Sequence, residues 1–575
     1  MKQIPGTELL IKALREEGVD TVFGYPGGMV IDIFDALYNQ DDIRLVLPRH
    51  EQALVHEADG YARSTGKIGV CLVTSGPGAT NTVTGIATAY YDSVPLLVLT
   101  GQVPCNLIGN DAFQEADIIG ITRGICKYGL ILKKREDLGR VLKEAFYIAQ
   151  TGKPGPVIID LPKDVMAQLG DSVYPDTVDI RGYKPSTGVH IGQLKKGIDL
   201  LKNAKKPLFL IGGGVNIAHA HEELTKLVEK THIPVVTTIM GKGALDTDHP
   251  YYVGNIGMHG CYAGNMAISD CDVLFSIGTR FSDRVTSKIS DFAKHAKIVH
   301  IDIDSSSISR NIVVDVPIVA DAKEAIQAML RYVKEADTAE WMNQIHAWAD
   351  AHPLHMKKGH GITPEAIIQA INEHKENAIV VTDVGQHQMW TTQYLQMDAS
   401  TRLLTSGGMG TMGYGLPGAV GAQLANPDKT VFCITGDGGM QMNIQEMATA
   451  VAEELPIVIC IFNNHYLGMV RQMQALFYRR HYSGVCTRRR KTCPPRCGGP
   501  SSICPDYTPD FVKLADSYGC LGLRVQEEDQ IKPALEQALA NKKGPTIIEF
   551  VIACDDLVFP MVQGGKALND MILDC

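Results

Sequence analysis

The stretch Gly436–Met469 constrains the fold more than any other part of the sequence. One apolar strand, Val431–Thr435, runs into it, and a second, Ile457–Phe462, ends at a pair of asparagines. A helical pattern separates the two strands, which predicts a strand–helix–strand unit of a parallel sheet. Ligands of such sheets bind at the carboxyl ends of the strands. We therefore expect Asp437 and Asn464, which follow the two strands, to lie together at that edge.

The side chains at this edge predict a site for a metal ion and a phosphate. A carboxylate and an amide oxygen are hard ligands that suit Mg²⁺, an ion that keeps part of its coordination shell for phosphate oxygens. Gly436, Gly438 and Gly439 allow close backbone approach and leave N–H groups free for an anion at a helix start. A single Gly-Asp-Gly is more often an ordinary turn, and only the complete pattern of two strand ends favours the metal site.

Length, charge and cysteine usage limit the class of protein. The 575 residues suffice for about three or four domains at roughly 150 residues each. A formal charge of −10 argues against a general nucleic-acid surface. No run of about 18 apolar residues predicts a membrane span, and the first residues lack the apolar core of a signal peptide. Most cysteines are scattered singly, which favours the reducing cytoplasm.

Helical and strand patterns alternate through most of the chain. In the first part, strands at Thr21–Phe23, Arg44–Leu47, Gly69–Thr74 and Leu96–Leu99 are separated by helical segments. The alternation predicts an α/β fold in which each domain is a mostly parallel sheet flanked by helices. Polar, turn-rich stretches near 170–190 and 335–360 are the predicted linkers, so the predicted domains are 1–180, 190–345 and 361–575.

Motifs in the first domain follow one another in the order of a known family. They are Tyr25-Pro26-Gly27-Gly28, Arg49-His50-Glu51-Gln52, Gly60–Arg63, Thr74–Asn81, Gly101–Pro104 and Asp111–Asp117. With the Asp437 and Asn464 motif, they resemble the large catalytic subunit of the acetohydroxyacid (acetolactate) synthases, which are thiamine diphosphate (ThDP) enzymes. The resemblance runs nearly end to end. It implies a pyrimidine-binding first domain, a central FAD-binding domain and a last domain that binds diphosphate and Mg²⁺.

The resemblance assigns the catalytic residues. Glu51 is expected to hydrogen-bond N1′ of the aminopyrimidine and so favour the tautomer whose 4′-nitrogen removes the C2 proton. Gln114 is expected near the reacting centre. Arg284 is expected to face the substrate carboxylate, a task for which a guanidinium fork is suited. A surface ion pair is the alternative for Arg284.

The residues that hold ThDP and its metal also follow from the resemblance. Asp437, Asn464 and the backbone carbonyl of Tyr466 are the expected Mg²⁺ ligands. Met412, although methionine is ordinarily core filler, is expected to wedge beneath ThDP and bend it, while the Gly410 carbonyl binds the 4′-amino group. The other expected contacts of ThDP are Tyr25, Gly27, Asn81, Gln386, His387, Gly438, Gly439 and Met469.

FAD is expected in the central domain. The segment Arg280-Phe281-Ser282-Asp283-Arg284 is typical of the FAD-dependent biosynthetic members, with Ser282 in place of the usual Asp. Lys153 stands where the family typically has an FAD-contacting Arg, and a lysine cannot make the same bidentate contact. The expected FAD-binding residues are Lys153, Gly212, Gly213, His259, Gly278, Arg280, Asp302 and Asp321.

The implied reaction is the synthesis of acetolactate for branched-chain amino acids. Pyruvate loses CO₂ on ThDP, and the remaining two-carbon unit adds to a second 2-oxoacid, pyruvate or 2-oxobutyrate. Because Glu51 and Asp437 meet across a dimer interface in this family, a homodimer or tetramer is expected, together with a small regulatory subunit. The alternatives are another ThDP carboligase, a flavin oxidase such as a pyruvate oxidase, and a non-catalytic ThDP-fold binding protein.

Two features depart from the family. Met473 occupies a position where many members have a Trp that shapes the second-substrate pocket, so a weaker preference for 2-oxobutyrate is predicted. The second departure is an insertion at 486–504, which contains Cys486, Cys493, Cys497 and Cys504 together with a run of basic residues. Its spacing leaves bound metal, disulfides and free thiols open. One hypothesis makes this insertion a redox-sensitive flap over the site.

Overall fold

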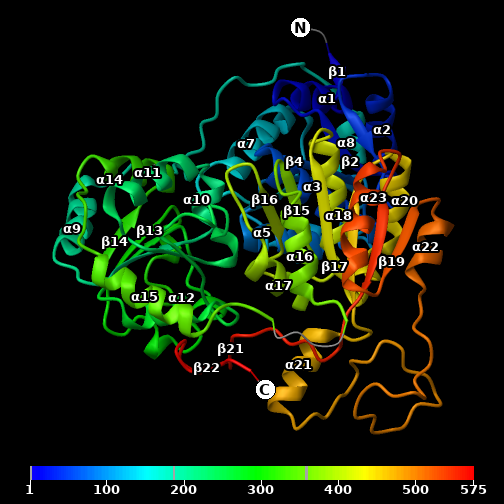
Figure 1. Ribbon diagram of the computed structural model, residues 1–575. Coiled ribbons are helices and arrows are strands. Elements are labelled where there is room, and N and C mark those ends of the chain that lie inside the picture. The colour runs from blue at the N-terminus through cyan, green and yellow to red at the C-terminus, as the bar shows by residue number, and fades with distance from the viewer. Residues whose placement is uncertain (1–2, 186–187, 357–360, 575) are drawn as a thin grey trace.

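The computed structural model describes residues 3–185, 188–356 and 361–574. It contains three six-stranded sheets, and the strand pairings described within them are parallel (Figure 1). The predicted α/β class with three domains is therefore confirmed. Residues 186–187 and 357–360 of the predicted linkers lie outside the described residues. Within the described ranges, no helix combines the length and apolarity needed to cross a membrane.

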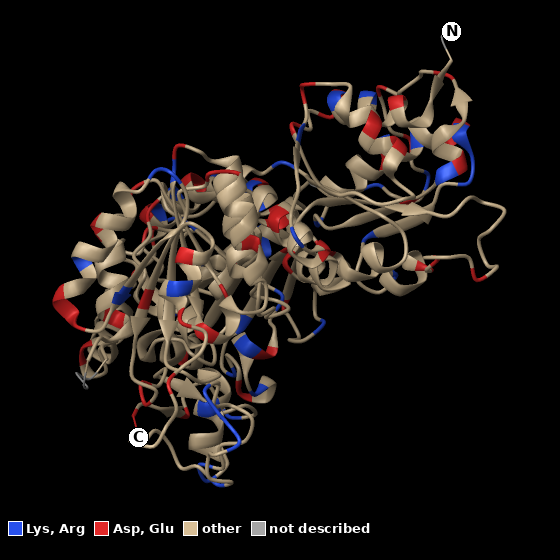
Figure 2. Cartoon of the chain, turned by 90° about the vertical axis from the view of Figure 1, so that its right-hand side faces the viewer, with Lys and Arg blue, Asp and Glu red and all other residues tan. Residues whose placement is uncertain are grey.

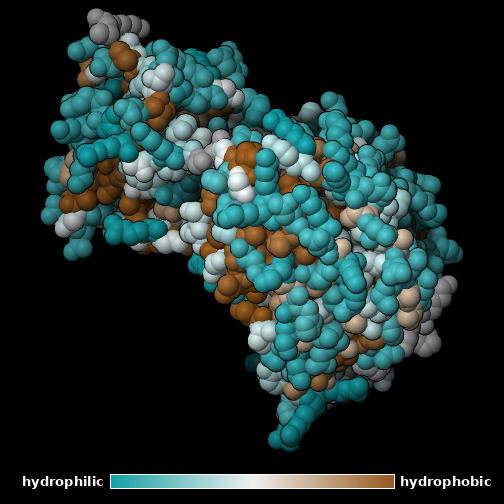
Figure 3. Space-filling view, turned by 90° about the vertical axis from the view of Figure 1, so that its left-hand side faces the viewer, coloured by the Kyte–Doolittle hydropathy of each residue, from teal (hydrophilic) through white to brown (hydrophobic). Residues whose placement is uncertain are grey.

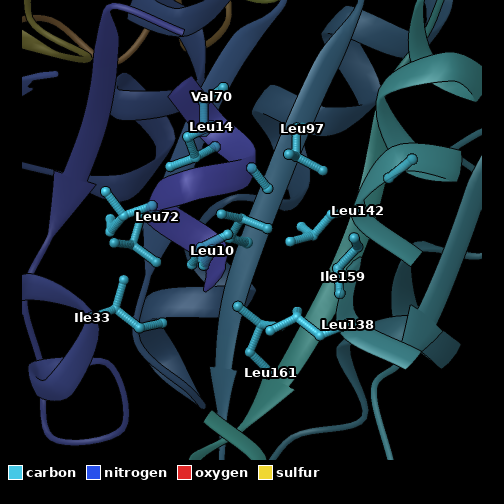
Figure 4. Packing of buried hydrophobic residues seen from close by; sticks show 14 of the residues in the cluster. Leu10, Leu14, Ile33, Val70, Leu72, Leu97, Leu138, Leu142, Ile159 and Leu161 are labelled. Atoms are coloured by element: carbon cyan, nitrogen blue, oxygen red, sulfur yellow. The ribbon is translucent and has the colours of Figure 1, made fainter. Parts of the chain in front are cut away.

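The first sheet has helices on both faces, because alternate residues of its strands point to opposite sides. Val70 and Leu72 belong to one buried cluster, whereas Cys71 and Val73 belong to another. The first cluster is covered by α1 (Gly6–Glu16), α2 (Ile31–Tyr38) and α7 (Leu138–Gln150) (Figure 4), and the second by α3 (Glu51–Thr65) and α5 (Val83–Asp92). The strand order is β3 (Arg44–Val46), β2 (Thr21–Tyr25), β4 (Gly69–Val73), β5 (Leu96–Gln102), β7 (Val157–Pro162), β6 (Tyr128–Ile131).

The third sheet repeats the topology of the first. Its order is β16 (Arg402–Thr405), β15 (Ala378–Thr382), β17 (Thr430–Gly436), β18 (Val458–Asn463), β20 (Thr546–Val551), β19 (Leu521–Val525). Counted along each domain, both sheets therefore have the order 2-1-3-4-6-5. One face is covered by α16 (Pro364–Asn372), α17 (Gln386–Tyr394) and α23 (Ile531–Ala540), and the other by α18 (Gly415–Ala425) and α22 (Phe511–Ser517).

The central sheet has a different topology. Its order is β11 (Tyr252–Asn255), β10 (Val235–Thr237), β9 (Pro207–Ile211), β12 (Val273–Ile277), β13 (Lys297–Asp302), β14 (Val316–Val319), or 3-2-1-4-5-6 by position in the domain. This is the order of dinucleotide-binding folds, whose ligands lie at the point where the strand order reverses. Here that point lies between β9 and β12.

The first and third domains pack through equivalent helices. Both α3 and α18 follow the second strand of their domain, and the two pack against each other. Glycines permit the contact, because a Cβ atom at Gly60 would overlap the carbonyl of Gly418, and one at Gly421 would overlap the carbonyl of Glu57. The two backbones therefore touch directly at this joint.

The connection between β17 and β18 corrects one prediction. The expected single helix is divided into α19 (Asp437–Met440), a 3₁₀ turn at Ile444–Glu446 and α20 (Met447–Ala452). Asn443 lies at the interruption with a non-helical φ of −133°, and its side-chain amide donates to the Gly413 carbonyl at 2.7 Å. This hydrogen bond to a neighbouring loop competes with helix continuation.

Candidate active site

Glu51 lies at the carboxyl edge of the first sheet, where it is the first residue of α3. His50 caps this helix by accepting a hydrogen bond from the backbone of Gln52 at 3.1 Å. The Glu51 carboxylate accepts a hydrogen bond from the Asn81 side chain at 2.9 Å. The structure thus brings together two predicted cofactor residues from the loops that follow β3 and β4.

The other predicted residues of the first domain surround this pair. A Cβ atom at Gly78 would lie 3.4 Å from Glu51 Oε1, which leaves the face of the carboxylate open. Gln114 has a left-handed backbone, φ 58°, and its Cα lies 2.9 Å from the position of a Cβ atom on Gly76. Tyr25 ends β2, and Gly27 packs on Thr74 at the start of the same loop as Gly76.

Asp437 and Asn464 lie at the carboxyl edge of the third sheet, as predicted. Asp437 follows β17 and is buried, and its Oδ2 atom accepts hydrogen bonds from Tyr507 at 3.0 Å and Thr487 at 3.2 Å. Burial raises the pKa of Asp437 to about 7, while the two hydroxyl groups act in the opposite direction. Asn464 donates to Gln386 Oε1 at 3.1 Å and accepts from the Tyr466 backbone N–H at 3.0 Å.

The turn that begins at Asp437 is lined by further predicted residues. A Cβ atom at Gly438 would lie 2.8 Å from the Leu467 side chain and 3.8 Å from Met412 Cε. Gly436 lies against the His387 ring, since a Cβ atom there would be 3.0 Å from Nδ1. Gly439 follows Gly438, and Met469 lies two residues after Leu467. Gly410 lies two residues before Met412 and has a φ of 69°.

These residues fit a metal-bound diphosphate. The carboxylate and amide oxygens are hard donors, and the Asp437 turn admits no Cβ atom at Gly438 without displacing Leu467. His387 is buried, and its Nε2 atom has no hydrogen-bond partner among the described residues. Burial lowers the pKa of His387 to about 3, so its imidazole is neutral and can donate one N–H to an anion.

Asp383 and Asp92 organise the loop that carries Gly410 and Met412, and sequence reasoning missed both. Asp383 accepts the backbone N–H groups of Gly413 and Gly415, each at 2.9 Å. Asp92, from the first domain, accepts the backbone N–H groups of Gly407 at 3.1 Å and Gly408 at 2.7 Å. Asp92 lies in no motif, and Asp383 opens the segment that leads to Gln386 and His387 without a predicted role of its own. Only the folded arrangement brings both aspartates to the loop.

Arg63 neutralises the buried carboxylates of Asp59 and Asp92, where the first domain meets the loop that carries Met412. Its guanidinium donates to Asp92 at 3.0 Å, to Asp59 at 2.7 Å and to the Thr405 carbonyl at 2.9 Å. The Tyr414 hydroxyl also donates to Asp59 at 2.8 Å. The first domain therefore holds the loop that leads to Met412 through a buried, paired network.

Glycine-rich strand ends meet at the topological switch point of the central domain. A Cβ atom at Gly212 would overlap the Gly278 carbonyl, so the ends of β9 and β12 approach each other closely. Gly213 follows Gly212, and Arg280 follows Gly278, so four predicted FAD residues gather there. Close glycine backbones at this position fit a dinucleotide.

The remaining predicted FAD residues have identifiable partners. Lys153 forms an ion pair with Asp304 at 3.3 Å, which connects the first and central domains. Burial raises the pKa of Asp302, at the end of β13, to about 6. Asp321 caps α14 (Ala322–Leu330) by accepting two backbone N–H groups. His259 is half-buried, and its carbonyl accepts a hydrogen bond from the Gln393 side chain at 3.1 Å.

Arg284 is not joined to either carboxylate. Its side chain is 68% exposed, and its nearest acidic partner, Asp283, is 4.0 Å away. Among the described residues, no hydrogen bond or ion pair connects Arg284, Glu51 and Asp437 with one another within the chain. The two predicted halves of the site are therefore built on separate sheet edges.

The insertion contains free thiols. Cys486, Cys493, Cys497 and Cys504 are each unpaired and partly buried. In the portion of the chain that the structure describes, no three His, Cys, Asp or Glu side chains are arranged to hold a metal ion. The described residues of the insertion thus show neither a disulfide nor a preformed metal site.

Family models of the three domains of thiamine pyrophosphate enzymes match the chain in order. The N-terminal TPP binding domain matches residues 4–121, the central domain 194–329 and the C-terminal TPP binding domain 383–550. The acetolactate synthase large subunit of Haemophilus influenzae is 43% identical over 583 residues, which covers 100% of this chain and 99% of the relative. The isozyme 3 large subunit of Escherichia coli is 42% identical over 589 residues, with 100% and 99% covered. The large subunit of Buchnera aphidicola is 44% identical over 583 residues, with the same coverage.

The matches extend through all three sheets and both candidate edges. They agree with the family that the motifs around Glu51 and Asp437 predict. The chain therefore belongs to the thiamine pyrophosphate enzymes and, among them, to the family of acetolactate synthase large subunits.

Proposed function

We propose that this chain is a ThDP- and Mg²⁺-dependent acetolactate synthase that condenses pyruvate with a second 2-oxoacid, pyruvate or 2-oxobutyrate. One observation carries the proposal. A chain that aligns end to end with acetolactate synthase large subunits keeps a buried carboxylate and an amide together at the carboxyl edge of its third sheet. Its first sheet presents a second carboxylate, held by Asn81, at the equivalent edge.

The residues have distinct tasks in this reaction. When bound, ThDP supplies an acidic carbon that acts as the nucleophile toward the 2-oxoacid carbonyl. Asp437, Asn464 and the Tyr466 carbonyl would hold Mg²⁺, and neutral His387 would donate an N–H to the diphosphate. Glu51 holds a proton at the aminopyrimidine N1′, and the Asn81 amide fixes the orientation of its carboxyl group.

The substrate residues and the loop at Met412 complete the assignment. Gln114 contacts the reacting substrate, and Arg284 pairs with its carboxylate through the guanidinium fork. Met412 would contact ThDP and support its bent conformation. Asp383 and Asp92 fix the loop that carries Met412, so both are positioning residues for this contact.

We further propose a homodimer in which the Glu51 edge of one chain faces the Asp437 edge of its partner. Apolar side chains exposed near both edges support it: Phe113 is 83% exposed, Ile31 57% and Met442 52%. Phe113 precedes Gln114, and Met442 packs on Gly413 beside the Met412 loop. Burial of such exposed apolar side chains stabilises association. Figure 3 shows further apolar areas on the side that lies to the left in Figure 1.

The further cofactor, the partners and the compartment belong to the same proposal. FAD would bind at the switch point of the central sheet in a structural role, with Lys153 in place of the arginine typical of the family. A small regulatory subunit joins the assembly, which is a dimer or a tetramer. The free thiols suit a reducing cytoplasm.

The direct test uses purified protein with ThDP, Mg²⁺ and pyruvate. Acetolactate is converted to acetoin by acid and measured by colour, while oxygen uptake is followed in the same samples. Acetolactate formation without oxygen uptake is expected. Oxygen uptake with acetyl product would favour a pyruvate oxidase, and no turnover with bound ThDP would favour a binding protein. Flavin absorbance of the purified protein tests the FAD assignment independently.

A further inference from the structure

The insertion begins and ends beside Asp437. The chain leaves α21 (Gly468–Phe477), passes through the cysteine-containing loop and returns to α22, forming the orange loop at the lower right of Figure 1. Thr487 directly follows the first cysteine of the insertion, and Tyr507 lies shortly after the last. Both hydroxyl groups donate to the same carboxylate oxygen, Asp437 Oδ2. The two ends of the insertion therefore meet at one acceptor atom.

The first end of the insertion also pairs with the segment that follows Asn464. The Leu467 backbone N–H donates to the Val485 carbonyl at 2.8 Å, and the Thr487 N–H donates to the His465 carbonyl at 3.1 Å. Tyr466 and Cys486 form an isolated antiparallel bridge between these bonds. The insertion thus contacts both strand-end segments from which the proposed metal ligands come.

His465 shows that this segment is held in an unusual conformation. Its φ of 65° places a non-glycine residue in the left-handed region, directly between Asn464 and Tyr466. Such a backbone persists only where the surroundings hold it. The Tyr507 ring packs against the His465 ring at a centroid distance of 4.8 Å, and the Arg488 guanidinium contacts His465 Nδ1. Arg488 begins a basic run on this loop, and Figure 2 shows Lys and Arg at the bottom of the molecule.

We propose that Thr487 and Tyr507 are positioning residues that orient Asp437 for metal binding. The inference rests on the proposed function, which makes Asp437 a Mg²⁺ ligand. Two O–H donors on Oδ2 fix the carboxylate plane and direct the other oxygen, Oδ1, toward the cation. Removal of a hydrogen bond to a metal-binding side chain typically lowers metal affinity about 10- to 100-fold.

The test compares variants that remove only a hydroxyl group. Tyr507→Phe and Thr487→Val are combined in one chain, with Tyr478→Phe as a control because the Tyr478 side chain is 64% exposed. Binding of Mn²⁺ as a probe is measured in the presence of ThDP from the free-ion signal in electron paramagnetic resonance. We expect the double variant to bind Mn²⁺ about 10- to 100-fold more weakly. Its kcat should recover at high Mg²⁺, and Thr487→Ser and Tyr478→Phe should retain the original affinity.

A shortened loop separates the hydroxyl groups from the rest of the insertion. Residues 489–505 are replaced by a short Gly-Ser linker, which suffices because both ends already contact Asp437. This variant should keep its Mn²⁺ affinity, whereas a loss equal to that of the double variant would overturn the assignment to the hydroxyl groups.

Asp437→Asn distinguishes failure of this inference from failure of the proposed function. Unchanged affinity in the double variant, with loss in Asp437→Asn, would overturn the positioning role and leave the metal site intact. Unchanged affinity in both would remove Asp437 from the metal site and overturn both proposals.

Discussion

The first and third domains have the same strand order and the same helix at their joint, yet their carboxyl edges differ in chemistry. In the first domain, Glu51 begins the helix after the second strand, and Asn81, its hydrogen-bond donor, ends the short helix after the third. In the third domain the loop after the third strand provides Asp437, and the loop after the fourth provides Asn464. The shared scaffold thus places polar groups at the carboxyl edge of both sheets. The identity of the residues at that edge decides which ligand each domain binds.

Burial distinguishes the two edges further. Glu51 is half-buried, and Phe113, which precedes Gln114, is exposed, whereas Asp437 is buried beneath Thr487 of the insertion and Tyr507, which follows it. The first edge thus carries an exposed apolar side chain, whereas the third is covered by its own chain. Under the proposed function, this difference means that the first carboxylate would meet a cofactor held by the partner chain, and the second would hold a cation within its own domain.

The largest expected effect comes from changing Glu51 at the carboxyl edge of the first sheet, which tests its catalytic role. Glu51→Gln should lower the rate of C2-proton exchange on ThDP by a factor on the order of 10² to 10⁴, because the carboxyl group that shares a proton with N1′ is lost. Exchange is measured by NMR after transfer to D₂O, and ThDP binding should persist. Glu136→Gln, at an exposed position, is the control. Original exchange rates in Glu51→Gln would remove its catalytic role.

The matching change at the carboxyl edge of the third sheet should affect ThDP binding instead of proton exchange. Asp437→Asn should weaken Mg²⁺-dependent ThDP binding by at least the 10- to 100-fold typical of altered metal sites, because the amide lacks the negative charge. Calorimetric titration of ThDP at fixed Mg²⁺ measures the change, with the exposed Asp428→Asn as control. If Asp437→Asn instead slowed proton exchange with full binding, the contrast between the two edges would be wrong.

The joint between the two domains can be tested through its glycines. Gly421→Ala should destabilise the protein by about 1–3 kcal/mol, because the added Cβ atom overlaps the Glu57 carbonyl and forces α3 and α18 apart. The midpoint of urea unfolding reports the loss. Gly124→Ala adds a Cβ atom where no atom lies within 4 Å and should leave the midpoint unchanged. Equal midpoints for both variants would contradict direct backbone packing.

The smallest expected effect concerns the second substrate. Met473 is half-buried on α21, close in sequence to the third edge. Met473→Trp should increase the preference for 2-oxobutyrate over pyruvate by about tenfold, because an indole adds apolar contact to a pocket that distinguishes one methylene. Competition between the two acids measures the ratio. Val470→Trp, at a 49% exposed site on the same helix, should leave the ratio unchanged.

The sequence was sufficient to predict the parallel sheets and the residues at their edges. Apolar strands such as Val431–Thr435 end in polar residues, and the position of Asp437 follows from that local pattern. The break in the following helix was not predicted, since it depends on the hydrogen bond from Asn443 to Gly413, far away in sequence. The contacts of Thr487 and Tyr507 with Asp437 depend on the path of an inserted loop, for which periodicity gives no signal.

The central claim is that the Glu51 edge of one chain and the Asp437 edge of its partner form one active site. Glu51→Gln and Asp437→Asn, each inactive alone, are unfolded together and refolded as a mixture, and acetolactate formation is measured. Random pairing should restore roughly a quarter of the original activity, because each mixed dimer contains one intact site. A mixture that forms mixed dimers but makes no acetolactate would contradict the claim.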